Sequence, residues 1–132
     1  MAICHEEAVR VADAYTAAWN SGSPQAVANF FAPDGNIVIN NGEPWRSRGG
    51  VTQMAAGFFA DIPDLSLHCD AVRAAGHHVV FLWTFEGTHS GTKRRVRVRG
   101  WEEWDLDGER KVKSSRGWYD AQDYERQVSG SA

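Results

Sequence analysis

The chain has 132 residues, 42% of them hydrophobic and 23% charged, with a formal net charge of -3 at pH 7. This length and apolar content predict one domain with its own core, and the acidic balance argues against a general nucleic-acid binder. No apolar run approaches the roughly 18 residues of a membrane span, and the first residues lack the pattern of a signal peptide. We therefore expect a soluble cytoplasmic protein with no nucleic-acid or membrane partner.

Three helices are predicted in the first half of the chain. Apolar residues recur with helical spacing through residues 6–20. Ser23 followed by Pro24 is typical of an N-cap and a first helical turn, so we expect a second helix that runs from Pro24 through Phe31. A third helix is expected over residues 51–60, where apolar side chains again fall on one side.

The rest of the chain is predicted to form strands. A short strand is expected at residues 36–40, and four longer ones follow the third helix at residues 65–74, 78–89, 93–105 and 110–121. Short glycine-containing turns between the longer strands predict an antiparallel meander, and the separation of helices from strands favours an α+β fold. We expect a single domain over residues 1–128 and a disordered polar tail at residues 129–132.

Two of these strands carry patterns that bear on partners. Residues 79–83 are apolar at every position, so both faces of that strand should be covered. The helices can cover only one face, and we expect a second copy of the chain to cover the outer face of the sheet in a homodimer. Residues 93–99 alternate basic side chains with valine, which is typical of a sheet with one solvated face.

Three short motifs follow one another along the chain: residues 15–22 (YTAAWNSG), residues 31–35 (FAPDG) and residues 87–91 (GTHSG). In this order and spacing the chain resembles, over nearly its whole length, the SnoaL-like branch of the nuclear transport factor 2 superfamily. The resemblance implies a cystatin-like cone-shaped α+β barrel, in which three helices wrap a strongly curved antiparallel sheet with a pocket at its mouth. The superfamily includes polyketide cyclases, ketosteroid isomerases, limonene-epoxide-hydrolase-like enzymes and non-catalytic binding domains, so the fold leaves the activity open.

The resemblance also implies roles for particular residues. The last-strand segment that ends at Asp120 resembles the aromatic-x-Asp segment in which cyclases and epoxide hydrolases keep an acid/base aspartate, which makes Asp120 the leading catalytic candidate. Tyr15 is similar in position to the helical tyrosine of the isomerase oxyanion hole, and Glu102 falls near the acidic partner in that hole.

Two parts of the family pattern are missing. Ile39 stands where the isomerases have their catalytic base, with only Asn40 and Asn41 beside it. The arginine-x-aspartate pair of the epoxide hydrolases is replaced by Thr84-Phe85-Glu86, although Asn40 could still position a water molecule. Neither the steroid-isomerase mechanism nor the limonene-type mechanism is therefore complete in this chain.

Strand alternation indicates which side chains share a face. It places Ser114, Arg116, Trp118 and Asp120 together on the last strand, and we expect Arg116 and Trp118 to line the pocket. In such apolar surroundings Asp120 would be suited to proton transfer; the alternative is an aspartate that caps a turn in solvent. On the preceding strand, Glu102 and Trp104 lie together on the face opposite the arginines. A buried Glu102 would need a partner, which Tyr15 or Arg116 could supply.

The remaining candidates have structural alternatives. His89 ends a strand beside a glycine turn and is either an acid, base or donor or a turn-stabilising hydrogen-bonding residue. No histidine or cysteine spacing supports a metal site. Six tryptophans, among them Trp83, Trp104 and Trp118, come from segments that should converge on one barrel, so several of them can wall a flat pocket for a ring-shaped ligand.

Two functions from different classes fit these observations. The first is an enzyme that carries out cofactor-free acid/base chemistry, such as cyclisation, isomerisation or hydration, on a small, mostly apolar molecule. Asp120 would transfer the proton, and donors from Tyr15, His89, Asn40 and Arg116 would stabilise a developing oxygen charge. The second is a non-catalytic ligand-binding or dimerisation module of the same fold.

Overall fold

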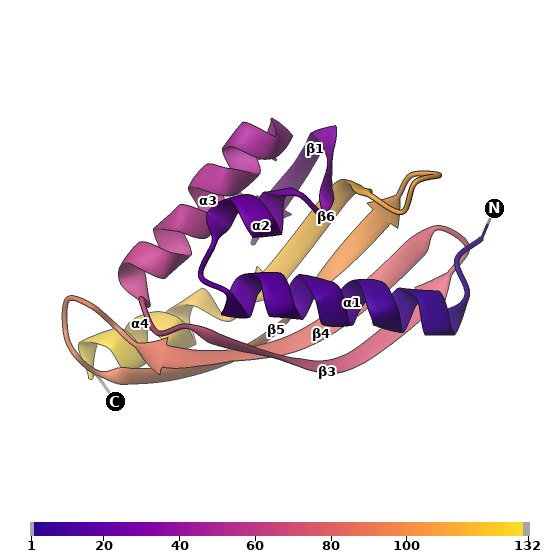
Figure 1. The fold of residues 1–132 in the computed structure, drawn as a ribbon. Helices are drawn as coiled ribbons and strands as arrows, with labels where there is room; N and C mark the ends of the chain where they lie inside the picture. The colour runs from indigo at the N-terminus through magenta and orange to yellow at the C-terminus, as the bar shows by residue number, and fades with distance from the viewer. Residues whose placement is uncertain (1, 131–132) are drawn as a thin grey trace.

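The computed structural model describes residues 2–130 and contains, within that range, four helices and six strands (Figure 1). The helices are α1 (His5–Asn20), α2 (Pro24–Ala28), α3 (Ser47–Asp61) and α4 (Ala121–Ser129). The strands are β1 (Phe31–Ile39), β2 (Trp45–Arg46), β3 (Ser66–Ala75), β4 (His78–Thr88), β5 (Arg95–Leu106) and β6 (Val112–Tyr119). The predicted α+β class is confirmed.

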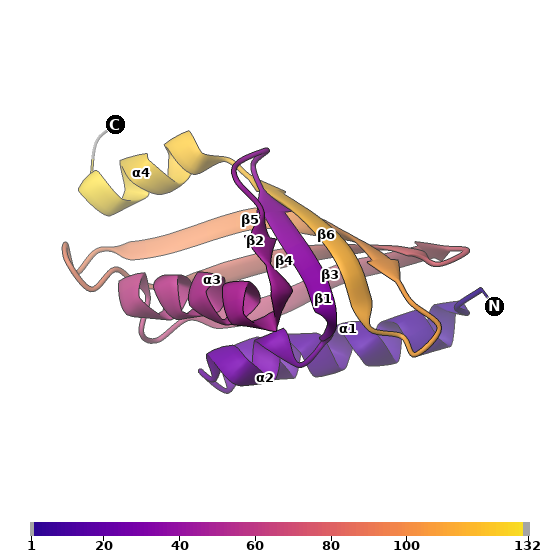
Figure 2. The ribbon, with the colours of Figure 1, turned by 90° about the horizontal axis from the view of Figure 1, so that it is seen from above.

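All six strands form one curved sheet in the order β2-β1-β6-β5-β4-β3. The meander from β3 to β6 is antiparallel as predicted, whereas β1 pairs with β6 in parallel. The sheet does not close into a complete barrel, because β2 and β3 remain its two edges. Figures 1 and 2 show α1, α2 and α3 on one side of the curved sheet.

The second helix and the first strand differ from the prediction. Helix α2 ends at Ala28, and Phe31 already belongs to β1. The pairing of β1 with β6 shifts its register between Phe31 and Asn36, and Pro33 lies exposed in this irregular part. Proline has no N–H to give to the ladder, and it is tolerated there because the ladder is interrupted at this point. Gly35 is required at the same bend, since a Cβ would lie 2.6 Å from the carbonyl oxygen of Val112.

Helix α4 takes the place of the predicted end of the last strand. Asp120 accepts a hydrogen bond from the backbone N–H of Asp123 at 3.0 Å and caps the helix N-terminus, and Gly130, with φ 77°, is the C-cap. An N-cap aspartate followed ten residues later by glycine is a readable helix signal. Of the predicted tail, Ser129 is the last residue of α4, and residues 131–132 lie outside the described part of the chain.

Helix α4 packs along β5 where that strand extends beyond the end of β6. The side-chain amide of Gln127 pairs with the backbone of Arg97 in both directions: its oxygen accepts from the N–H at 2.7 Å, and its nitrogen donates to the carbonyl at 2.9 Å. The amide therefore satisfies backbone groups that β6 does not reach. Tyr124 is buried against Phe85 and Tyr119 and anchors the helix.

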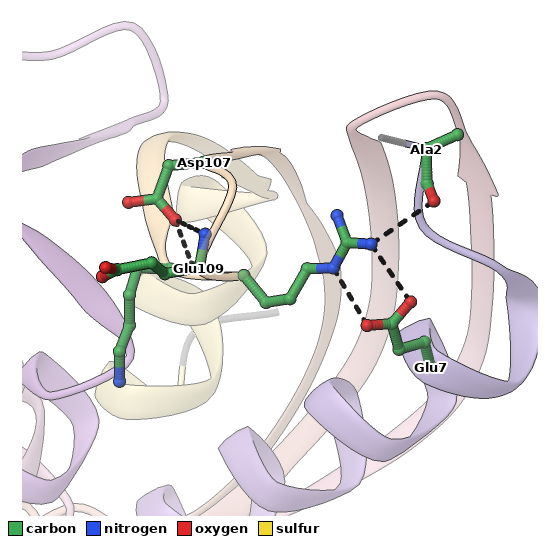
Figure 3. A network of polar contacts seen from close by, with 6 residues as sticks. Ala2, Glu7, Asp107 and Glu109 are labelled. Carbon is green, nitrogen blue, oxygen red and sulfur yellow. Dashed lines mark hydrogen bonds and ion pairs between the residues drawn. The ribbon is translucent and has the colours of Figure 1, made fainter.

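At the other end of the sheet, an arginine ties the β5–β6 turn to the start of the chain (Figure 3). The Nε of Arg110 lies 2.9 Å from Oε2 of Glu7, and one of its terminal nitrogens donates to the carbonyl of Ala2 at 3.3 Å. The hydrogen bond from Arg110 is the main cause that lowers the pKa of Glu7. Asp107 accepts hydrogen bonds from two backbone N–H groups and organises the same turn.

None of the helices within residues 2–130 combines the length and the hydropathy that a membrane crossing requires.

Candidate functional site

An apolar cavity of about 60 Å³ lies between the concave face of the sheet and helices α1 and α3. This is less than half of the roughly 150 Å³ of an engineered apolar cavity that binds benzene, so the space accommodates a compact group. Its walls come from two helices, five strands and the loop that precedes β3. The lining residues are Trp19, Ile37, Ile39, Met54, Phe58, Leu65, Leu67, Trp83, Phe85, Glu102, Gly117 and Tyr119.

Four of the lining residues form a closed ring of aromatic contacts, which we call the aromatic cage. The ring centroids of Phe58 and Phe85 are 6.3 Å apart, those of Phe85 and Trp83 5.8 Å, those of Trp83 and Tyr119 6.4 Å, and those of Tyr119 and Phe58 6.4 Å. Trp19 extends this cluster from α1, with its ring 6.1 Å from that of Phe58. Aromatic rings from α3, β4 and β6 thus meet around one small space.

Gly100 allows this arrangement by leaving room on the inner face of β5. It stands between Trp83 and Tyr119 in the register of the three strands. A Cβ on Gly100 would lie 2.6 Å from two carbons of the Trp83 ring and 2.4 Å from the carbonyl oxygen of Trp118. The indole of Trp83 therefore lies across β5 at Gly100, where any side chain would collide with it.

Glu102 is the one acidic residue among the described residues that line the cavity, and it is buried at 7% exposure. Its Oε1 accepts hydrogen bonds from Nε1 of Trp104 at 3.0 Å, from Oγ of Ser115 at 2.9 Å and from the Tyr15 hydroxyl at 3.2 Å. Its Oε2 accepts from the same hydroxyl at 3.1 Å. Helix α1 and strands β5 and β6 therefore each supply a donor to this one carboxyl group.

Burial dominates the electrostatics of this cluster. Desolvation raises the pKa of Glu102, and the hydrogen bonds from Trp104, Ser115 and Tyr15 lower it only in part. Burial, with the neighbouring charge of Glu102, also raises the pKa of Tyr15 well above its usual value, so this tyrosine stays a hydrogen-bond donor. No lysine, arginine or histidine is among the described residues that line the cavity. A carboxyl group in this setting can hold a proton nearer to neutrality and release it to a ligand.

Several predicted site residues do come together here. Tyr15, Glu102 and Trp104 form the hydrogen-bonded cluster, and the expected partnership of Tyr15 with Glu102 is confirmed. The predicted alternation of β5 is confirmed as well, with Glu102 and Trp104 inside and the arginines outside. Trp83 is buried and lines the cavity.

Arg116 and Trp118 lie on the opposite face from the one predicted. The residues of β6 that point inward are Ser115, Gly117 and Tyr119, and Arg116 and Trp118 share the outer face with Ser114. Trp118 packs there against Trp101, with the ring centroids 5.6 Å apart. Alternation showed which residues share a face, but both faces of β6 carry an aromatic and a polar residue, so the pattern did not show which face is inner.

The six tryptophans also divide between the two faces. Trp19, Trp83 and Trp104 are buried inside, whereas Trp45, Trp101 and Trp118 lie outside the core, with Trp45 and Trp101 at 40% and 41% exposure. Three of the six tryptophans therefore face the interior, and of the two expected to line the pocket from β5 and β6, Trp104 is inside and Trp118 is outside.

Asp120 and His89 have structural roles in this fold. Asp120 is exposed at the N-terminus of α4 and is not among the residues that line the cavity. Nδ1 of His89 accepts hydrogen bonds from the backbone N–H groups of Gly91 at 3.1 Å and Thr92 at 3.2 Å, which is the turn-stabilising alternative. The geometry of Asp120 thus corresponds to a capping aspartate in solvent, and that of His89 to a turn-stabilising residue.

Asn40 holds two strands together at the end of the cavity. Its side-chain oxygen accepts from the backbone N–H of Tyr119 at 3.0 Å, and its own N–H donates to the carbonyl of Gly117 at 2.8 Å. It thereby fixes the backbone that carries Tyr119 into the aromatic cage. Its positive φ of 52° is one that asparagine tolerates better than most residues.

The sequence reasoning missed Tyr119, Phe85 and Ser115 as site residues. A signal was present for Tyr119, which shares a face of β6 with Ser115 and Gly117. Gly117 stands directly opposite Glu102 in the register. A glycine beside a buried acid indicates a position where space is kept. The position of Phe85 depends on the pairing of β4 with its neighbours, which the sequence alone does not specify.

A family model described as a SnoaL-like domain matches residues 12–113 of the chain. A search of curated protein sequences finds no significant match. Among solved structures, a hypothetical protein with a ketosteroid isomerase-like fold from Catenulispora acidiphila, in complex with trimethylamine, is similar. Its TM-score is 0.83 and its identity 22%, over 90% of this chain and 92% of that one.

Two further structures resemble the chain to a similar degree. AclR, a proposed hydroxylase from Streptomyces galilaeus, has a TM-score of 0.83 at 20% identity, over 98% of this chain and all of that one (100%). A proposed SnoaL-like polyketide cyclase from Jannaschia sp. has a TM-score of 0.80 at 14% identity, over 94% of each chain. At these identities the likenesses establish the fold, and the activity has to be argued from the site.

Proposed function

We propose that this chain, which belongs to the SnoaL-like domain family, binds a small, mostly apolar, ring-type molecule in the aromatic-lined cavity. We propose further that it carries out cofactor-free acid/base chemistry on that molecule, as a cyclisation, an isomerisation or a hydration. Its solved structural neighbours include a proposed polyketide cyclase and an epoxide hydrolase/cyclase-like enzyme, which supports this class of reaction.

The observation that carries the proposal is the position of Glu102. Its carboxyl group lines an otherwise apolar cavity, and burial raises its pKa, so it can donate a proton to an oxygen of the ligand. Tyr15, Trp104 and Ser115 would then stabilise the carboxylate that remains, because each already donates a hydrogen bond to it. Glu102 thus replaces the exposed Asp120 as the candidate proton carrier.

The experiment compares two variants with the unchanged protein, using cyclopentene oxide as the substrate because it is a small cyclic epoxide. In Glu102→Gln we expect the rate of hydration to fall about 100-fold or more, while the affinity for cyclopentanone changes only a few-fold. The matched control is Asp120→Asn, which should keep near-normal turnover. Equal loss in both variants, or no loss in Glu102→Gln, would contradict the role of Glu102.

A non-catalytic binding module is the second candidate, and one observation favours it. Both oxygens of the Glu102 carboxyl group accept hydrogen bonds from the chain, and no buried side-chain polar atom among the described residues lacks a hydrogen-bond partner. Such a network is also what a purely structural core cluster requires. In that case cyclopentanone would still bind, no epoxide would turn over, and Glu102→Gln would change only the stability.

We also propose that the chain forms a homodimer through the outer face of the sheet. A row of directly paired residues crosses four strands there: Ala71, Leu82, Trp101 and Trp118. Leu82 and Trp101 are 37% and 41% exposed, which is unusual for large apolar side chains that lie side by side. A second copy packed on this row would remove it from water. The assembly is measured by light scattering at micromolar concentration.

A further inference from the structure

The aromatic cage and Glu102 line the same cavity, and together they present negative charge on several sides. The faces of aromatic rings carry the negative part of a quadrupole and attract cations. Trp83, the strongest type of ring for this interaction, is buried at 8% exposure, so solvent does not screen its face. The described lining of the cavity contains no cationic side chain to complement either the rings or the carboxyl group.

The two oxygens of Glu102 are used unequally. Oε1 accepts from Trp104, Ser115 and Tyr15, whereas Oε2 accepts from Tyr15 alone among the described residues. A carboxylate oxygen has two lone-pair positions, so Oε2 retains one for a donor that comes from the cavity. A buried carboxyl group is neutralised either by a proton or by a positive partner, and because the described lining supplies no cation, a cationic ligand can take that place.

The size of the cavity limits the choice further. A cavity of about 60 Å³, less than half of the roughly 150 Å³ that takes up benzene, suits a compact dimethylammonium head group and excludes a multi-ring cation.

We propose that the cavity selects a small tertiary amine, bound as its ammonium ion with the N–H on Oε2 of Glu102 and the methyl groups against the aromatic cage. The inference rests on the proposed function only in placing the ligand in this cavity, and it adds the chemical class. If the amine arrives uncharged and Glu102 protonated, the proton passes from the carboxyl oxygen to the nitrogen, and the same ion pair results.

The test uses two probes of the same shape, 2-(dimethylamino)ethanol and 3-methylbutan-1-ol, which differ by a nitrogen in place of a carbon. Titration calorimetry should show that the amine binds at least about tenfold more tightly than the alcohol. Glu102→Gln should abolish this preference, and the exposed control Asp123→Asn should retain it. Trp83→Leu gives an independent variant, in which the affinity for the amine should fall more than that for the alcohol.

The outcomes separate this inference from the proposed function. If the alcohol binds as tightly as the amine, the cavity takes small apolar molecules but the amine class is wrong. An amine preference that persists in both Glu102→Gln and Trp83→Leu would place the amine elsewhere on the protein and overturn the inference. If neither probe binds up to about 10 mM, a concentration at which even a weak specific site is filled, the amine inference fails, whereas the proposed function is decided separately by the binding of cyclopentanone.

Discussion

Replacement of Tyr15 by phenylalanine removes one hydroxyl from the cluster around Glu102 and keeps the ring. Tyr15 is fully buried, and its ring lies 5.1 Å from that of Trp104 and 5.6 Å from that of Phe81, contacts that phenylalanine can retain. A hydrogen bond to a charged group contributes about 1.5–3 kcal/mol and one between neutral groups about 0.5–1.5 kcal/mol. We therefore expect the free energy of unfolding to fall by about 1–3 kcal/mol, or roughly 3–5 °C in Tm per kcal/mol.

The size of this loss should depend on pH. Burial raises the pKa of Glu102 above 4.5, its ordinary value, so the folded protein holds the proton more tightly than the unfolded chain. The stabilisation from this difference is complete below about pH 4.5 and is lost as the pH rises through the folded-state value. The Tyr15 hydroxyl opposes the shift, so Tyr15→Phe raises the pKa further. The variant should therefore lose least stability in acid and most above the folded-state pKa.

A double-mutant cycle of Tyr15→Phe and Glu102→Gln, followed by urea unfolding from about pH 4 to about pH 8, measures this coupling. We expect a coupling free energy of about 1 kcal/mol or more at neutral pH that declines toward acid pH. Tyr124→Phe, on α4, is the matched control and should show no such pH dependence. A coupling below about 0.5 kcal/mol at every pH would refute the assignment of Tyr15 as a donor to Glu102.

Three further predictions follow from the packing. Gly100→Ala should lower the free energy of unfolding by about 2 kcal/mol or more in chemical denaturation and weaken binding of cyclopentanone, because the added Cβ displaces Trp83; unchanged binding would contradict the cavity geometry. Asp120→Ala should cost about 1 kcal/mol through loss of the N-cap of α4 and leave ligand affinity intact, as calorimetry can check. Leu82→Glu, beside Trp101, should convert the proposed dimer to a monomer in light scattering; an unchanged mass would place the interface elsewhere.

The site was predicted well where strand patterns were simple and poorly where they were mixed. On β5, arginine alternates with valine, so the inner position of Glu102 beside Trp104 follows from local sequence. On β6, both faces carry polar and aromatic residues, and only the pairing of Glu102 with Gly117 shows that Tyr119 and not Trp118 points inward. Asp120 and Gly130 are readable as the N-cap and C-cap of α4. Asp120 was instead interpreted as a catalytic residue, because its segment resembles the one in which cyclases and epoxide hydrolases keep an acid/base aspartate.

The sequence by itself determined the α+β class and the antiparallel meander of the last four strands, since these follow from periodicity and short turns. It also showed that a buried Glu102 needs a partner, with Tyr15 and Arg116 as the candidates, and the structure shows that the partner is Tyr15. Only the tertiary structure decided which face of β6 is inner, and that Asp120 caps a helix. It also decided that rings from α3, β4 and β6 meet across Gly100 to enclose a cavity. The reason is physical: periodicity reports which neighbours share a face, whereas the register between strands distant in sequence decides what that face meets.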